Sequence, residues 1–272
     1  MNSLKERLDI VLTERGLYPS REKAKAAVMA GVVFVDGQKV DKAGTPTNPD
    51  AEIYIKENIC PYVSRGGLKL EKALREFQVD LNEKICVDIG ASTGGFTDCM
   101  LQHGASKVFA IDVGYGQLDY KLRIDPRVVN MEKINVRYLD PDQIDSNACF
   151  ISIDVSFISL KLVFPVAAAL LKNGGSIICL VKPQFEAGRE QVGKNGIVRE
   201  ESVHREVLRK VADYGRENGL EVFGVTFSPI TGAKGNIEYL MYLKTKKAAD
   251  EVMFGEEDIR KIVALSHEAL ER

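Results

Sequence analysis

The stretch KICVDIGASTGGFT, residues 84–97, predicts the fold of most of this chain. An apolar segment runs directly into a turn of small residues, and a segment of helical character follows. A glycine-rich turn between a first strand and a helix is typical of open α/β sheets, where a ligand approaches the backbone and the N-terminus of the helix. We therefore predict a strand that ends near Asp88, a ligand-binding loop, and a helix over residues 95–103.

The spacing of the glycines excludes some of the nucleotide ligands that bind such loops. GxxxxGK[ST] is missing, which excludes a P-loop, and Gly90, Gly94 and Gly95 do not follow the GxGxxG pattern of dinucleotide-binding loops. An acid, Asp88, precedes the first glycine instead. A second acid, Asp112, ends the next apolar segment, where its carboxylate could accept hydrogen bonds from ribose hydroxyls. NAD enzymes use an acid at this place too, so the pattern fits several nucleotide ligands.

The chain beyond this loop alternates between apolar segments and helical segments. Strands are predicted at 107–112, 128–132, 149–154 and 174–182, with helices near 159–172 and 200–218. This alternation indicates a doubly wound, Rossmann-like α/β fold with a mostly parallel sheet. Segments 220–228 and 237–245 lack a helix between them, which predicts an antiparallel pair at one edge. We expect 183–202 to be a mobile lid and 256–272 to be a surface helix.

The first 58 residues predict a separate, small α+β domain. Its elements are a helix over 4–16 with Leu4 and Leu8 on its apolar face, a second helix over 20–31, a hairpin around Asp36-Gly37, a loop over 43–50 and a strand over 52–55. A linker over 59–64 contains Pro61. The α/β domain then covers 65–272 and begins with an amphipathic helix.

Composition limits the function classes. The formal net charge is −2, so any nucleic acid must be held by local basic patches. Such patches occur near residues 15–25 and 65–75, although for the first patch a solvated helix face explains the charges equally well. Five cysteines without a CxxC pair and three scattered histidines indicate reduced thiols and no metal site. A charged N-terminus and the lack of any apolar run near ~20 residues predict a cytoplasmic protein without a membrane span.

The N-terminal pattern resembles a known domain. RLDIVLTERGLYPSREKAKAAVMAGVVFVDGQKV, residues 7–40, is similar to the S4 RNA-binding domain, and the similarity covers most of residues 6–57. The resemblance implies that the second helix and the hairpin face RNA. With the junction between the domains, the predicted RNA-binding residues are Arg7, Arg15, Arg21, Lys23, Lys25, Arg65 and Lys72.

Four charged residues stand out once the strands are placed. Asp154 and Lys182 each end an apolar strand, and ligands bind at the carboxyl ends of strands in open α/β sheets. Lys69 lies on the helix that leads into the α/β domain, and Glu238 lies at the start of the last strand. Taken singly, Lys69 and Glu238 look like ordinary surface residues.

The order Lys69–Asp154–Lys182–Glu238 resembles the K-D-K-E tetrad of FtsJ-type 2′-O-methyltransferases. The stretch DIGASTGGF resembles motif I of class I methyltransferases, with Thr93 in place of the proline of the FtsJ-like form. SRGGLKL, IDVSFISL, LVKPQFE and KGNIEY extend the similarity, so the chain as a whole resembles the TlyA/haemolysin A family. That family implies S-adenosylmethionine as the methyl donor and ribosomal RNA or ribosomal subunits as partners, with cytidines of 16S and 23S rRNA as acceptors.

The resemblance assigns roles to individual residues. Lys182 is the predicted base and Lys69 a second cation, while Asp154 and Glu238 orient the lysines and the hydroxyl. A carboxylate next to a lysine favours its charged form, so base catalysis and simple positioning both stay open. The predicted cofactor-binding residues are Asp88, Gly90, Ala91, Ser92, Thr93, Gly94, Gly95, Phe96, Asp112, Val113 and Asp154.

Three alternatives stay open. The chain could be a haemolysin-type membrane-active protein, a non-catalytic RNA-binding assembly factor, or an enzyme that acts on a small molecule or uses NAD. The sequence does not determine the oligomeric state.

Overall fold

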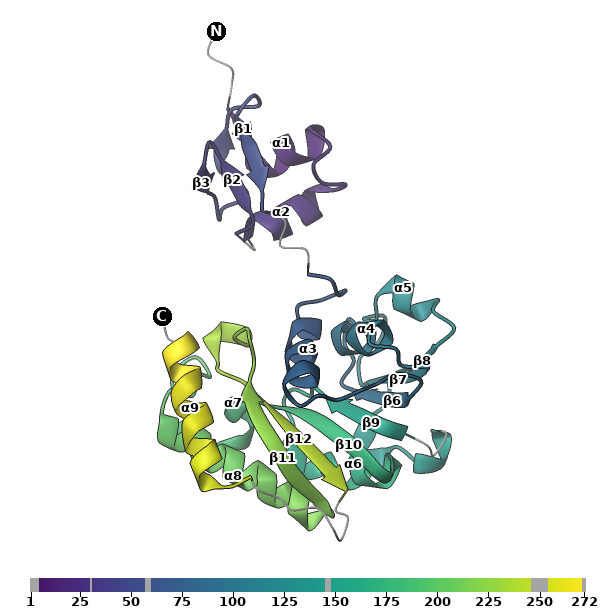
Figure 1. Cartoon of the computed structure of the whole chain (residues 1–272). Coiled ribbons are helices and arrows are strands. Elements are labelled where there is room, and N and C mark those ends of the chain that lie inside the picture. The colour runs from purple at the N-terminus through teal and green to yellow at the C-terminus, as the bar shows by residue number, and fades with distance from the viewer. Residues whose placement is uncertain (1–4, 30, 57–59, 145–147, 246–253, 271–272) are drawn as a thin grey trace. The chain divides into compact units, whose positions relative to one another are not determined.

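The computed structural model describes residues 5–29, 31–56, 60–144, 148–245 and 254–270. The chain divides into two compact units, Met1–Ile59 and Cys60–Arg272 (Figure 1), which are described separately. Residues 60–64, predicted as a linker, pack on the second unit. Tyr62 is buried there, and the Val63 N–H donates a hydrogen bond of 2.8 Å to Asp98 Oδ2.

In its described residues the first unit has two helices, α1 (Leu8–Glu14) and α2 (Arg21–Met29), beside a three-stranded sheet. Its strands β2 (Val33–Val35), β3 (Gln38–Lys39) and β5 (Ile53–Ile55) lie in the order β3-β2-β5. The predicted hairpin is confirmed, because β2 and β3 pair antiparallel through a turn at Asp36 and Gly37 with φ of 49° and 76°. The apolar sides of both helices fill the core with Leu8, Leu12, Ala24 and Val28, and Val33 of β2 packs with them.

The first helix begins later than the sequence predicts, and Leu4 lies outside the described residues. Residues Glu6–Arg7 form a short strand, β1, which pairs antiparallel with β4 (Pro46–Thr47). The prediction of a loop over 43–50 was therefore wrong at β4. The Leu8 and Asp9 N–H groups, at the start of α1, donate to the Thr45 and Ala43 carbonyls, so tertiary pairing sets the start of the helix.

The second unit contains a seven-stranded sheet in the order β11-β12-β10-β9-β6-β7-β8. Strands β6, β7, β8, β9 and β10 run parallel, and β12 is antiparallel to both β10 and β11. The predicted doubly wound sheet with an antiparallel pair at one edge is thus confirmed. The strand bounds are β6 Ile85–Ile89, β7 Lys107–Asp112, β8 Val128–Glu132, β9 Ala148–Ile153, β10 Leu171–Val181, β11 Leu220–Phe227 and β12 Tyr239–Thr245.

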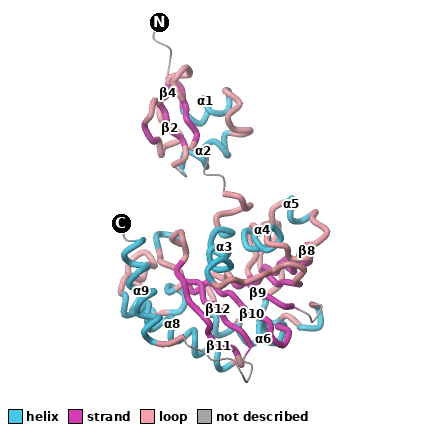
Figure 2. Tube along the Cα trace, in the orientation of Figure 1, coloured by secondary structure: helices cyan, strands magenta, loops and turns pink. Residues whose placement is uncertain are grey.

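Helices cover both faces of this sheet (Figure 2). Successive residues of a strand point to opposite faces, so Val87 and Ile89 join one core and Cys86 joins the other. The first core is closed by α6 (Phe164–Leu170), α8 (Glu201–Glu217) and α9 (Glu256–Leu270). The second is closed by α3 (Gly66–Glu76), α4 (Gly95–Gln102) and residues around α5 (Tyr120–Arg123).

Three expectations need revision. Helix α9 is not simply a surface helix, because Ile259 and Val263 are buried in the core. Strand β10 begins at Leu171 rather than at 174, directly after the shorter α6. The segment 183–202 is not an open loop: it carries α7 (Pro183–Glu186) and a 3₁₀ turn at Arg189–Gln191. Val198 and Glu186 in this segment are buried, and its role as a lid stays a prediction.

Within the described ranges, no helix has both the length and the apolar character needed to cross a membrane.

Candidate active site

The glycine-rich loop after β6 is joined directly to the end of β9. Gly90 has φ of +88°, and a Cβ at this position would lie 2.3 Å from the carbonyl oxygen of Asp154. The Asp154 N–H also donates a hydrogen bond of 2.9 Å to the Ile89 carbonyl. Only glycine permits this backbone conformation and this approach without strain, so the loop and Asp154 form one rigid junction.

Gly94, which was also predicted to bind the cofactor, packs against neighbouring side chains. Its φ is +94°, and a Cβ would meet the side chains of Leu122 at 2.2 Å and Leu118 at 2.9 Å. The space beside Gly94 is therefore filled by leucine side chains from the segment before and within α5. This glycine lets the loop pack on its neighbour, whereas Gly90 is the one that borders a cavity.

Asp88 lies beneath the loop. Its carboxylate is fully buried and accepts hydrogen bonds from Thr97 Oγ1 at 2.6 Å and Ser152 Oγ at 2.9 Å. Burial raises the pKa of Asp88 to about 6, although both hydroxyl bonds act in the opposite direction. These contacts tie β6 to α4 and β9, so Asp88 supports the loop from below, and direct contact with a cofactor stays a prediction.

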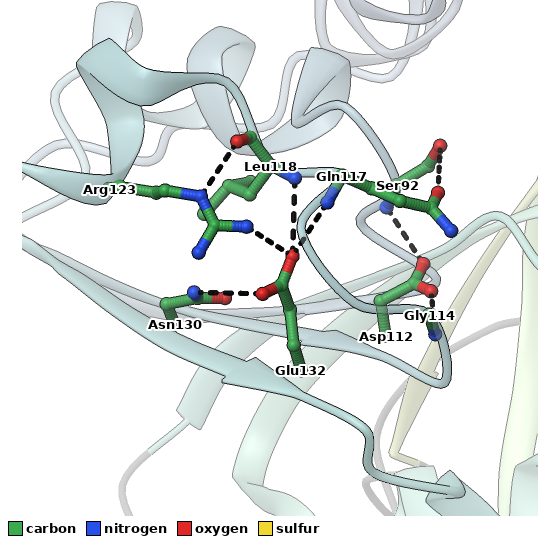
Figure 3. Close-up of polar contacts among 8 residues, drawn as sticks. All are labelled: Ser92, Asp112, Gly114, Gln117, Leu118, Arg123, Asn130 and Glu132. Atoms are coloured by element: carbon green, nitrogen blue, oxygen red, sulfur yellow. Dashed lines mark hydrogen bonds and ion pairs between the residues drawn. The ribbon is translucent and has the colours of Figure 1, made fainter.

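A cavity of ≈ 440 Å³, here called the strand-edge pocket, opens at the carboxyl ends of β6, β7 and β9. Asp112 forms one wall: its Oδ2 accepts from the Ser92 N–H at 2.8 Å, and its Oδ1 accepts from the Gly114 N–H at 2.7 Å (Figure 3). The predicted residues that line this pocket are Gly90, Ser92, Asp112, Val113 and Asp154; others include Gln117, Asn135, Val136 and Phe157.

Glu132, which the sequence analysis missed, holds one wall of this pocket in place. Its side chain is 6% exposed and accepts from the Gln117 N–H at 2.9 Å and the Leu118 N–H at 3.3 Å (Figure 3). It also pairs with Arg123, whose Nε donates to the Leu118 carbonyl at 3.0 Å. The Arg123 guanidinium, followed by these backbone bonds, lowers the pKa of Glu132 to about 2. Glu132 ends β8 as Asp112 ends β7, so the rule applied to strand ends could have identified it.

A second cavity of ≈ 320 Å³, here called the entrance pocket, lies beside the first. It is bounded by residues 64–69, by the glycine-rich loop and by Ile230–Gly232. The two pockets share Gly90, Ser92 and Asp154, so they meet at the junction of β6 and β9. The predicted residues in this pocket are Arg65, Lys69, Gly90, Ala91, Ser92, Thr93, Gly95, Phe96 and Asp154.

The four predicted catalytic residues form two ion pairs, and one member of each pair, Lys69 or Asp154, lines the entrance pocket. Lys69 Nζ on α3 lies 2.6 Å from Glu238 Oε2, and Lys182 Nζ at the end of β10 lies 2.6 Å from Asp154 Oδ1. Lys182 also donates to Ser156 Oγ at 2.9 Å. Both lysines are 9% exposed and Glu238 is 2% exposed. Burial removes water from both lysines and from Glu238, whereas the Asp154 side chain is 23% exposed. Each lysine has its carboxylate as compensation.

An exposed aromatic residue borders the strand-edge pocket. Phe157 is 91% exposed and has φ of +64°, and its ring centroid lies 5.0 Å from that of Phe185. A bulky residue in this conformation is a backbone outlier, and such strain concentrates at functional sites. The sequence contains no sign of the positive φ, so Phe157 could not be singled out from it.

The predicted RNA-binding residues have different surroundings. Arg7 and Arg21 both bind Asp9, Arg15 Nη1 donates to the Ala51 carbonyl at 2.7 Å, and Lys23 and Lys25 are exposed. Arg65 is exposed at the mouth of the entrance pocket.

Lys72 is less available than the sequence suggests. Its Nζ donates to the Phe227 carbonyl at 2.7 Å and lies 3.6 Å from the centroid of the Phe227 ring. This half-buried side chain packs α3 against β11, so it would have to leave both contacts to reach RNA.

Among the described residues, no group of three or more histidine, cysteine, aspartate or glutamate side chains is placed to hold a metal ion. The five cysteines are free thiols.

Comparison with known proteins identifies the class to which this fold and site belong. The family model described as "FtsJ-like methyltransferase" matches residues 62–245, and that described as "S4 domain" matches residues 6–53. The chain is therefore a methyltransferase of the FtsJ-like type with an N-terminal S4 domain.

Relatives that match this chain along both units identify its family within this class. YqxC of Bacillus subtilis is 52% identical over 99% of this chain and 97% of its own length. The Mycobacterium tuberculosis protein named "16S/23S rRNA (cytidine-2'-O)-methyltransferase TlyA" is 40% identical over 88% of this chain and 90% of its own. A solved structure from Streptococcus thermophilus is 48% identical, covers 98% of each chain and has a TM-score of 0.79. The chain belongs to the TlyA/haemolysin A family.

Proposed function

We propose that this enzyme transfers a methyl group from S-adenosylmethionine to the 2′-hydroxyl of cytidines in 16S and 23S ribosomal RNA. The observation that carries the proposal is the meeting of two pockets at Gly90, Ser92 and Asp154. One pocket has the features of a nucleoside site, and the other holds the two lysine–carboxylate pairs at its edge. A group that passes between two bound molecules would cross at this junction.

The strand-edge pocket fits the donor. Asp112 lies where a ribose diol would be bound by a carboxylate at the end of the second strand, and apolar side chains such as Val136 provide walls for an adenine ring. The backbone of Gly90 borders the place where the two pockets join. When bound, S-adenosylmethionine supplies an electrophilic methyl group on a sulfonium centre.

The two ion pairs beside the entrance pocket act on the acceptor. A ribose hydroxyl is a weak nucleophile and loses its proton as the O–C bond forms and the S–C bond breaks. Lys182, at 2.6 Å from Asp154 Oδ1, takes this proton, and Asp154 then stabilises the ammonium group. This step needs the neutral amine of Lys182 as the acceptor of the proton. Lys69, held by Glu238, orients the hydroxyl.

An exposed aromatic ring at the strand-edge pocket and an exposed arginine at the entrance pocket support RNA as the acceptor. The exposed ring of Phe157 offers a stacking surface for an unpaired base, and Arg65 is placed to bind a phosphate. The S4 domain adds a second RNA-binding unit. Cytidine and the two ribosomal RNAs are taken from the name of the TlyA relative. Such a substrate places the enzyme in the cytoplasm.

The test is methyl transfer from labelled S-adenosylmethionine to ribosomal subunits, with the product mapped by resistance of the modified position to alkaline cleavage. We expect label on a ribose 2′-oxygen of cytidine. Lys182→Met should abolish transfer and preserve donor binding, whereas Lys161→Met, at an exposed lysine outside both pockets, should leave transfer unchanged. Label on a base atom would contradict the proposal, as would tighter binding of NAD than of S-adenosylmethionine.

A further inference from the structure

A carboxylate in the first unit binds two arginines at once. Asp9 lies in the first turn of α1, is 3% exposed, and accepts hydrogen bonds from both Arg7 and Arg21. The three side chains, together with Glu22 and Lys25, line a hollow of ≈ 280 Å³ on this unit.

The carboxylate has a fixed position. The Asp9 N–H donates to the Ala43 carbonyl at 3.0 Å, and the Asp9 carbonyl accepts from Thr13 Oγ1 at 2.9 Å. Leu8 and Leu12, on either side along α1, are fully buried. Arg7 is fixed in the same way, because its backbone pairs with Pro46 in the β1–β4 ribbon. The core of the unit therefore determines where the Asp9 oxygens lie.

The two arginines are held by this carboxylate but stay accessible. Arg7 binds in a fork, with Nε 3.0 Å from Asp9 Oδ1 and Nη2 3.1 Å from Oδ2, and Arg21 Nη2 lies 3.1 Å from Oδ2. Each arginine side chain is 53% exposed. A guanidinium has five N–H donors, so most of the donors of both groups remain available on the solvent side. The bonds from Arg7 first, and from Arg21, lower the pKa of Asp9 and keep it ionised at neutral pH.

We propose that Asp9 is a positioning residue that presets Arg7 and Arg21 as a seat for one backbone phosphate of the RNA. The proposal rests on the proposed function only in taking RNA as the substrate. Three cations and two carboxylates in the hollow leave one net positive charge, which matches a single phosphodiester. Planar guanidinium groups suit phosphate oxygens, and side chains already ordered before binding lose less entropy when they bind.

The proposal predicts that Asp9→Asn weakens RNA binding, whereas charge attraction alone predicts that the same variant strengthens it. Asp9→Asn removes a negative charge from a site that binds RNA, so Coulomb attraction alone predicts tighter binding. If Asp9 presets the arginines, the variant must instead bind RNA about threefold to tenfold more weakly, because one or two long side chains are then ordered only on binding.

Glu22 offers a matched control within the same hollow. Glu22→Gln removes the same charge, and no bond between Glu22 and either arginine is present in the described part of the unit. Binding of the full-length chain to protein-free ribosomal RNA is measured by fluorescence anisotropy over a range of salt concentrations. We expect Glu22→Gln to bind RNA as tightly as the wild type or more tightly. Equal behaviour of Asp9→Asn and Glu22→Gln would overturn the proposal.

Two further variants separate positioning from loss of folding. In an Arg21→Ala background, Asp9→Asn should have a smaller effect, because one of the positioned groups is already gone. Gly44→Ala leaves Asp9 intact but places a Cβ 2.8 Å from Arg7 Nη1, at a φ outside the left-handed region. It should weaken RNA binding and leave the thermal unfolding curve unchanged. Wild-type affinity in Gly44→Ala, or full additivity of Asp9→Asn and Arg21→Ala, would contradict the seat.

The outcome is distinguishable from failure of the proposed function. Asp9→Asn should retain donor affinity and the maximal transfer rate at saturating RNA. A methyl group found on a base would refute methylation of the 2′-hydroxyl but would not affect the proposed phosphate site. If the variants weaken binding to ribosomal subunits but not to protein-free RNA, the hollow binds an acidic protein surface and the phosphate seat is wrong.

Discussion

Lys69 and Glu238 are 169 residues apart in the sequence, yet their side chains form a hydrogen-bonded ion pair of 2.6 Å with 11% and 3% of the side chains exposed. The pair joins the first helix of the methyltransferase unit to the start of β12. Because both groups are buried, each is the main compensation for the charge of the other.

Glu238→Gln should therefore damage both stability and catalysis. The Lys69 ammonium would face a neutral amide, so we expect the free energy of unfolding to fall by about 3 kcal/mol. The rate of methyl transfer should fall on the order of 100-fold, because Lys69 loses the group that fixes its position. Urea unfolding and single-turnover rates at saturating RNA and donor measure the two effects.

The control is Glu76→Gln on the same helix. Glu76 is 39% exposed and lies 3.7 Å from Lys72, so its loss should change the free energy of unfolding by less than about 1 kcal/mol. A similar response in the two variants would show that burial of the Lys69–Glu238 pair has no special role.

Glu132→Gln should weaken donor binding without affecting RNA binding. The variant loses the ion pair with Arg123 and loosens the segment that presents Gln117 to the strand-edge pocket. We expect about a tenfold loss of S-adenosylmethionine affinity in calorimetric titration, the usual effect of removing a charged hydrogen bond. Asp125→Asn, which breaks the nearby Asp125–Arg127 pair outside the strand-edge pocket, is the control and should bind the donor normally.

A second variant shows whether Glu132 acts through Gln117. Gln117→Ala combined with Glu132→Gln should weaken donor binding by less than the sum of the single effects, since both act on the same segment. Strict additivity would mean that Glu132 supports the pocket by another route.

Phe157→Gly should separate stability from activity. A residue in the left-handed region is strained by roughly 1–2 kcal/mol unless it is glycine, and the Phe157 ring is 91% exposed. We expect the free energy of unfolding in urea to be unchanged or slightly higher. Methyl transfer at low RNA concentration should fall about tenfold, because the variant lacks a stacking surface for a base. Glu83→Gly, at an exposed residue with φ of 56° outside both pockets, should leave transfer unchanged. If the affinity for S-adenosylmethionine also falls about tenfold, Phe157 contributes to donor binding instead of RNA binding.

His204 should make folding stability depend on pH. It is fully buried: Nε2 contacts the Val198 carbonyl at 3.2 Å, and Nδ1 contacts Tyr239 Oη at 2.9 Å and His267 Nε2 at 3.0 Å. Burial, followed by the neighbouring His267, lowers the pKa of His204 to about 4 from 6.5. The folded state thus holds the imidazole neutral. Its stabilisation is complete above pH 6.5 and is lost as the pH falls toward 4.

The difference between the wild type and His204→Gln isolates this effect, because the raised pKa of Asp88 acts in the opposite direction over the same pH range. Between pH 7.5 and pH 5 the wild type should lose on the order of 2 kcal/mol more than the variant in urea unfolding. His103→Gln, on the less buried end of α4, should retain the wild-type dependence. Parallel curves for all three proteins would refute the assignment.

The regular pattern of the α/β unit was readable from the sequence because strands and helices have different periods and because ligands bind at strand ends. That rule identified Asp154, Lys182 and Asp112. Lys69 and Glu238 could be chosen only by family resemblance, since neither has a local feature that distinguishes it from a surface charge.

Other parts of the structure depend on contacts that no local pattern contains. The β1–β4 pairing joins two-residue strands far apart in the chain, and strands of this length have no visible period. The positive φ of Phe157 and the place of Asp9 between two arginines are likewise set by tertiary packing. For Lys72, the sequence shows a charge on a helix but not that Phe227 covers it.

The contact between Gly90 and the carbonyl oxygen of Asp154 has a consequence for how this enzyme can change over evolution. A side chain at position 90 would push on the end of β9, where Asp154 follows the strand. Substitutions that retune donor affinity at this turn would thus shift the acceptor chemistry as well. Substitutions in the wall of the strand-edge pocket that Glu132 supports can change donor affinity more easily, because that wall can shift without displacing Asp154.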